Sequence, residues 1–129
     1  MKSLLRPVFS FACLWFLASS ALAADISGQW RAEFDTMIGV QKYVFEFKVD
    51  GEKLTGKAIG ERDGEKAEVV LVEGRISGNE VSFVENLNFQ GMPLRIAYQG
   101  TVTNENEIKL TRQVGDVAAE TLVARRVHE

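Results

Sequence analysis

A regular alternation of apolar and polar residues, interrupted by short turns, constrains this chain more than any other feature. A period of two residues is typical of a β-strand with one buried face, because successive side chains point to opposite sides of the strand. Turn signals recur at residues 38–39, 50–51, 63–64, 77–79, 90–91, 104–107 and 115–116. The pattern predicts consecutive antiparallel strands joined by hairpin turns.

The predicted strands lie near residues 27–37, 40–50, 53–62, 66–76, 80–89, 93–103, 107–113 and 118–127. Eight strands joined in order can close into an up-and-down barrel, which leaves no exposed sheet edge. The alternation places aromatic residues such as Trp30, Phe45 and Tyr98 inside and charged residues outside. An outer-membrane barrel needs the opposite arrangement. We therefore expect an all-β, eight-stranded antiparallel barrel that is not inserted in a membrane.

The predicted third strand carries small residues on its inner face. Gly56, Ala58 and Gly60 share that face with Leu54 in the segment KLTGKAIGER. Two interpretations are open: the glycines let the strand bend at a barrel corner, or the missing side chains leave part of a ligand cavity. An eight-stranded barrel is just wide enough to be filled by side chains or to hold one small ligand.

Residues 1–23 have the features of a secretory signal peptide. Lys2 and Arg6 precede an apolar run over residues 8–17, and the segment ends in small residues up to Ala23. The apolar run is too short to span a bilayer. We expect cleavage after Ala23, which leaves residues 24–129 as one periplasmic or secreted barrel domain.

The charge balance argues against several classes of partner. The chain has a formal net charge of −3, and removal of residues 1–23 would make it more acidic, because that segment carries two basic residues and no acid. Nucleic acids and anionic membranes attract clustered Lys and Arg, which the sequence lacks. The single cysteine, Cys13, would leave with the signal peptide, so we expect no disulfide.

Two charged residues fall on the predicted inner face. Glu85 alternates in step with Val81 and Phe83, and Arg112 alternates in step with Ile108 and Leu110. Burying a single ion costs several kcal/mol. We therefore expect Glu85 and Arg112 to meet inside the barrel, with Tyr98 between them, or to reach water or a ligand.

Gln41, Tyr43 and Tyr98 add amide and hydroxyl groups to the same inner face. Together with Glu85 and Arg112 they form a candidate ligand-binding cluster. One interpretation is a structural ion pair at a solvated barrel mouth. The other is the polar end of an otherwise apolar pocket that orients a small molecule.

Residues for common catalytic chemistry are scarce. The single histidine, His128, lies next to the C-terminus, and no Gly-x-Ser-x-Gly motif is present. The Asp-Gly-Glu segments at 50–52 and 63–65 are typical of turns rather than of metal ligands. We expect no metal and no cofactor.

Glycoside hydrolysis is the enzymatic activity that the sequence excludes least, because it requires only two suitably placed carboxyl groups. Glu85 and Glu120 are the candidates. A neighbouring Arg112 is expected to lower the pKa of Glu85, whereas a general acid needs a raised pKa. A non-enzymatic protein is therefore the favoured interpretation.

Three segments carry a resemblance to known barrels: SGQW at 27–30, DGEKLTG at 50–56 and LVARRV at 122–127. They resemble the lipocalin and avidin-like eight-stranded barrels. The resemblance implies that Gly28 and Trp30 open the first strand and that the indole covers the closed end of the barrel. An arginine of the last strand should pack on it, and alternation with Leu122 and Ala124 identifies Arg126.

Three longer segments are YVFEFKVDGEKLTGKAIGE at 43–61, VEGRISGNEVSFVE at 72–85 and IKLTRQVGD at 108–116. Through them, residues 24–129 resemble more narrowly the small secreted bacterial lipocalin-like domains that occur alone or beside proteins described as glycoside hydrolases. That resemblance implies an alternative function as a carbohydrate-associated accessory or interaction module. Val44, Val84 and Ala97, expected to be exposed between charged residues, would then contribute to a docking surface. Trp30 is the only tryptophan after residue 23, so the tryptophan-walled biotin site of avidins is not expected.

Overall fold

The structure is a computed structural model that describes residues 24–37, 39–62 and 64–128. The predicted signal peptide lies outside the described residues. The strands are β1 Gly28–Thr36, β2 Gly39–Asp50, β3 Lys53–Arg62, β4 Glu65–Val70, β5 Val72–Ser77, β6 Glu80–Phe89, β7 Met92–Asn104, β8 Glu107–Val114 and β9 Ala118–Arg126. In the described ranges there is no helix with the length and hydropathy of a transmembrane span.

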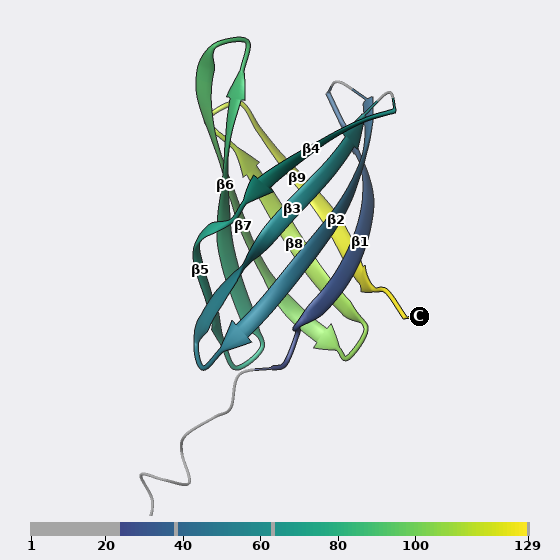
Figure 1. The fold of residues 1–129 in the computed structure, drawn as a ribbon, viewed down its shortest axis with the longest axis vertical. Helices are drawn as coiled ribbons and strands as arrows, with labels where there is room; N and C mark the ends of the chain where they lie inside the picture. The colour runs from purple at the N-terminus through teal and green to yellow at the C-terminus, as the bar shows by residue number, and fades with distance from the viewer. Residues whose placement is uncertain (1–23, 38, 63, 129) are drawn as a thin grey trace, which may run out of the picture.

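These strands form a closed antiparallel barrel (Figure 1). Consecutive strands are paired in the sheet except β4 and β5, which both pair with β3, and β1 also pairs with β9, which brings the first and last strands together. The predicted eight-stranded antiparallel barrel is confirmed. The segment predicted as one fourth strand, residues 66–76, is divided into β4 and β5.

The division occurs at Leu71, whose backbone N–H donates a 2.8 Å hydrogen bond to the carbonyl of Gly56. Beyond it the pairing of β5 with β6 shifts register between Val72 and Arg75, and Glu73 has a positive φ of 54°. Such a bulge bends a strand and ends its regular pairing. β4 therefore follows β3, while β5 follows β6 and meets β3 at a single residue pair.

The glycines of β3 serve two purposes. Gly56 has a φ of +149°, and a Cβ there would overlap the carbonyl oxygen of Glu46, so the close approach of β2 and β3 requires glycine. A Cβ on Gly60 would lie 3.1 Å from Cε1 of Tyr43. Gly60 thus leaves room for the tyrosine ring inside the barrel. The bend and the ligand cavity that the sequence left open stay predictions.

Aromatic rings fill the middle of the barrel. Phe45 is fully buried and contacts Phe47, Phe83 and Tyr98 at centroid distances of 5.6 Å. Val84 was expected to be exposed on the outer face, and this prediction is wrong. It lies on the outer side of β6 but is only 5% exposed, because it is paired between Val72 of β5 and Ala97 of β7.

Arg126 and Trp30 close one end of the barrel, as the resemblance implied. The guanidinium carbon of Arg126 lies 4.6 Å from the centroid of the Trp30 ring. Its N–H groups also donate to the backbone carbonyls of Glu105, Ser27 and Asp25 at 2.8, 3.1 and 3.0 Å. Gly28 has a φ of +126°, which favours glycine at the start of β1. One side chain thus joins the N-terminal segment, the β7–β8 turn and the last strand.

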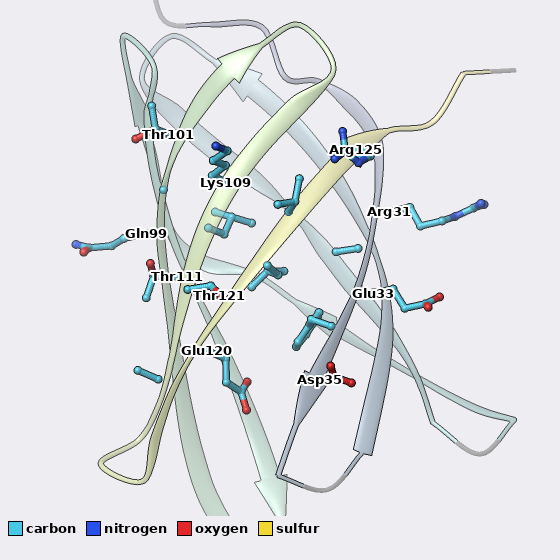
Figure 2. A pocket seen from close by; sticks show the side chains of 17 residues that line it. Arg31, Glu33, Asp35, Gln99, Thr101, Lys109, Thr111, Glu120, Thr121 and Arg125 are labelled. Atoms are coloured by element: carbon cyan, nitrogen blue, oxygen red, sulfur yellow. The ribbon is translucent and has the colours of Figure 1, made fainter.

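The seam between β1 and β9 is short. Residue pairing covers Trp30 with Arg126 and Arg31 with Arg125. Past these pairs the two strands diverge, and the close-up in Figure 2 shows them separating toward Asp35 and Glu120. An open groove of about 1120 Å³ follows this seam on the outside of the barrel.

Replacing Arg126 with alanine should lower the free energy of unfolding by about 2 to 4 kcal/mol, because it removes the cation–π contact and leaves three carbonyls without their donor. Urea denaturation measures the change. The matched control is Arg125→Ala, which removes an exposed ion pair to Glu107 and should cost less than about 1 kcal/mol. Equal effects of the two substitutions would contradict the proposed role of Arg126.

Candidate ligand-binding site

A cavity of about 490 Å³ is lined by the end of β1 and the start of β9, opposite Trp30 near the start of β1 and Arg126 at the end of β9. Its mouth is formed by the β1–β2 turn, β4, the β6–β7 hairpin and the β8–β9 turn. The walls are mostly apolar and include Ala67, Val69, Leu87, Leu94, Val114 and Val117. This volume is within the usual range for small-molecule sites.

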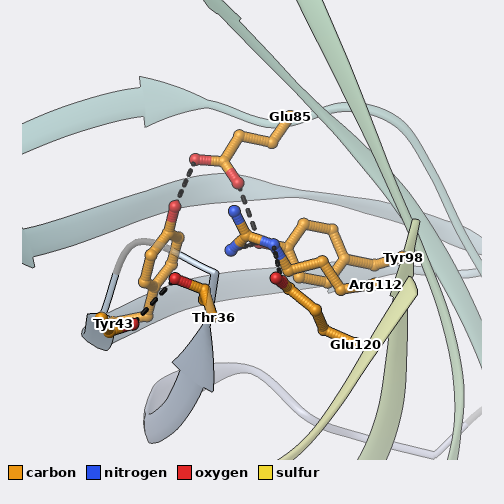
Figure 3. A network of polar contacts seen from close by, with 7 residues as sticks. Thr36, Tyr43, Glu85, Tyr98, Arg112 and Glu120 are labelled. Atoms are coloured by element: carbon orange, nitrogen blue, oxygen red, sulfur yellow. Dashed lines mark hydrogen bonds and ion pairs between the residues drawn. The ribbon is translucent and has the colours of Figure 1, made fainter. Parts of the chain in front are cut away.

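The floor of the cavity is a polar network centred on Glu85 (Figure 3). The hydroxyl of Tyr98 donates to Oε1 of Glu85 at 2.8 Å, and the hydroxyl of Tyr43 donates to Oε2 at 3.2 Å. Glu85 is only 2% exposed. Both carboxylate oxygens therefore have a hydroxyl partner from another strand, β7 on one side and β2 on the other.

Arg112 joins this network through Tyr98. Its Nη1 donates a 3.1 Å hydrogen bond to the Tyr98 hydroxyl, so that hydroxyl lies between Arg112 and Glu85 as the sequence predicted. The guanidinium also lies over the rings of Phe34, Tyr43 and Tyr98, at 5.1, 5.2 and 5.7 Å from their centroids. Arg112 is 6% exposed. It is held by aromatic faces as well as by polar groups.

The ion pair of Arg112 is with Glu120 rather than with Glu85. Nε of Arg112 lies 3.2 Å from Oε1 of Glu120, although the approach is not aligned for a hydrogen bond. The two residues are cross-strand partners in the β8–β9 hairpin. The sequence analysis considered Glu120 only as a possible second catalytic carboxyl. Counting residues outward from the turn at 115–117 would have paired it with Arg112.

Gln41 carries a buried polar atom in the cavity that has neither a hydrogen bond nor an ion pair among the described residues. It is 9% exposed, it lines the cavity, and its Nε2 has no hydrogen-bond partner among the described residues. An unpaired buried amide is destabilising, because it has lost its hydrogen bonds to water without replacement. A molecule inside the cavity can supply the missing partner.

Burial controls the acidity of the network. The pKa of Glu85 is raised, because burial disfavours the carboxylate more than the Tyr98 hydroxyl, the Arg112 charge and the Tyr43 hydroxyl favour it. Arg112 was expected to lower this pKa. It does so, but its effect is smaller than that of burial. Burial and the nearby Glu85 charge also raise the pKa of Tyr98 well above its ordinary value.

The remaining candidate residues lie apart from this network. His128 is exposed and contacts Asn106 at 2.9 Å, in the β7–β8 turn at the closed end of the barrel. Within residues 24–37, 39–62 and 64–128, no group of three or more His, Cys, Asp or Glu side chains could hold a metal ion.

Comparison with known proteins supports the fold alone. No protein-family model matches the chain, and no match was found among curated proteins. Among solved structures, the chain is similar to a redesigned beta barrel, with a TM-score of 0.61 and 18% sequence identity. The match covers 86% of this chain and 100% of the designed one. The class that these findings define is the closed antiparallel β-barrel.

The raised pKa of Glu85 predicts a pH-dependent stability. Between the ordinary pKa of 4.5 and the higher folded value, the folded protein binds the proton more tightly, so the free energy of unfolding falls as pH rises. Glu85→Gln removes this dependence. We expect the stability of the wild type relative to Glu85→Gln to decrease from about pH 4 upward and then level off.

Urea denaturation of both proteins across this pH range measures the difference. Carboxyls with a lowered pKa, such as Glu73 bonded to Arg95, act in the opposite direction, but they are common to both proteins and cancel. If the free energy of unfolding of the wild type relative to Glu85→Gln increased with pH, the result would contradict a raised pKa of Glu85.

Removing Arg112 should be strongly destabilising, because it leaves Glu120 and Glu85 without their cation. We expect Arg112→Ala to cost about 3 to 5 kcal/mol and the further change Glu120→Ala to recover part of that loss. The control is Thr111→Ala on the exposed face of β8, with a change below about 0.5 kcal/mol. Strictly additive effects of Arg112→Ala and Glu120→Ala would show that the two groups do not interact.

Proposed function

We propose that this chain is an exported, non-enzymatic barrel that binds a small molecule in the cavity opposite the Trp30–Arg126 closure. The main support is the unpaired amide of Gln41 beside an open cavity of about 490 Å³. A cavity meant only for packing would be filled by side chains, as the middle of the barrel is filled by Phe45 and Phe83. Apolar walls would hold the body of the ligand, and the network of Glu85 would orient its polar end.

The closed end supports a structural kinship with small secreted lipocalin-like domains. Gly28, Trp30 and Arg126 occupy the positions that this kinship requires, and their contacts are structural. The periplasmic or secreted location rests on the sequence of residues 1–23. The relation to lipocalin-like domains and the periplasmic or secreted location belong to the same proposal, since an exported barrel would bind small molecules outside the cytoplasm.

Binding in the cavity can be tested with Nile red, a neutral dye whose fluorescence rises in apolar surroundings. Ala67 is exposed at the mouth, lines the cavity and is paired with Gly60. We expect Ala67→Trp to fill the mouth and to weaken dye binding by at least about tenfold, which corresponds to roughly 1.4 kcal/mol. Fluorescence titration measures the change.

The matched control is Ala119→Trp, which places the same side chain in the outer groove between β1 and β9. Dye binding should be unchanged in that variant. Equal binding by both variants would place the dye elsewhere on the protein, and absent binding by the wild type would contradict the proposed function.

Carbohydrate association is the second candidate. The outer groove favours it, because Gln99, Thr101, Thr111 and Thr121 line it with groups that can hydrogen-bond to sugar hydroxyls. Retarded migration in gels containing xylan would support an accessory role on this face. Turnover of aryl-glycosides that is lost in Glu85→Gln would instead indicate a hydrolase, with Glu85 and Glu120 as its two carboxyls.

A further inference from the structure

Among the ionisable side chains that line the cavity, carboxyl groups outnumber basic groups. Four carboxyl residues of the lining, Glu61, Glu65, Glu85 and Glu120, face two cationic residues, Lys66 and Arg112. Glu65 and Lys66 lie at the exposed rim, whereas Glu85 and Glu120 lie on the floor with Arg112. On the floor there are thus two carboxyls for one guanidinium.

Arg112 is poorly placed to receive an anionic ligand. Its guanidinium contacts Glu120 on one side, donates to Tyr98 on another and is covered by the faces of aromatic rings, among them Phe34. A bound carboxylate or phosphate would have to displace Glu120, which would leave that side chain uncompensated where it is only 12% exposed. The floor therefore disfavours anions.

Glu85 and Gln41 make the same floor receptive to a donor. A carboxylate offers about four lone-pair positions, and two hydroxyls contact Glu85, one at each oxygen. The unpaired amide of Gln41 is 9% exposed and lies on the lining of the cavity. A half-turn of that amide exchanges its oxygen and nitrogen, so Gln41 can offer an acceptor or a donor to a head group.

We propose that the cavity selects an amphipathic molecule whose head group is a protonated amine, held against Glu85 while its apolar body contacts the walls, with Glu120 adding a second negative charge to the floor. This inference rests on the proposed function of the cavity. An ammonium group supplies the missing positive charge and up to three N–H donors, which the carboxylates and the Gln41 amide can accept. The apolar walls, including Leu87 and Leu94, then contact the hydrocarbon part.

Amine binding also has a consequence for protons. Glu85 is faced by Tyr43 of β2, Tyr98 of β7 and Arg112 of β8, and Glu120 of β9 lies on the far side of Arg112. A new cation beside Glu85 favours its ionised form. Any proton that Glu85 holds in the empty cavity is therefore released when the amine binds.

The test compares octylamine, octanol and octanoate as competitors of Nile red at neutral pH. These probes share a chain and differ in the charge of the head group. We expect the concentration of octylamine that displaces half of the dye to be at least about tenfold lower than that of octanol. Octanoate should be the weakest competitor. Glu120→Gln should reduce the advantage of octylamine over octanol, whereas Glu80→Gln, outside the cavity, should leave it unchanged.

The outcomes separate the two proposals. In one outcome Ala67→Trp abolishes dye binding, but octanol or octanoate binds as tightly as octylamine or more tightly. That outcome would overturn the amine proposal and would still support a binding site in the cavity. Absent dye binding by the wild type would overturn both. Should Glu120→Gln fail to fold, Glu61→Gln at the half-exposed rim replaces it, with a smaller loss of the same advantage expected. An unchanged preference in the variant would contradict the role of these carboxylates.

Discussion

The contact between Arg126 and Trp30 is the constraint on which the rest of the structure depends. β1 and β9 are the two ends of the domain, and their pairing covers only two residue pairs. The guanidinium compensates by stacking on the indole and by binding three backbone carbonyls from two other segments. With that end closed, the barrel can be open only at the other end. The location of the cavity follows from this asymmetry.

The polar floor is stable because its members satisfy one another. Glu85 and Arg112 do not form a direct ion pair, and each would be costly inside the barrel by itself. The Tyr98 hydroxyl solves this by donating to Glu85 and accepting from Arg112, while Glu120 neutralises the guanidinium. Phe34 and Tyr43 cover the cation with their ring faces. Gln41 is left over, and an unpaired buried amide beside an open volume is the clearest sign of a missing partner.

The interruption at Leu71 and the bulge between Val72 and Arg75 separate β4 from β5 beside the cavity. β4 pairs with β3 alone, and residues of β4 and of the β6–β7 hairpin both line the cavity. Gly56 accepts the hydrogen bond from Leu71 and allows the close approach to β2. The cavity thus depends on a backbone irregularity as well as on small side chains.

The sequence by itself determined the strand order, the turns and the face of most side chains, because a period of two is a local property of an extended chain. It therefore also predicted that Glu85, Arg112 and Tyr98 lie inside, whereas the contact of Arg126 with Trp30 was implied by the resemblance to lipocalin barrels. Only the tertiary structure decided the unpaired state of Gln41 and the break at Leu71. These depend on the register between strands, on the bulge that shifts it and on distances across the barrel. Alternation along one strand carries no information about any of them.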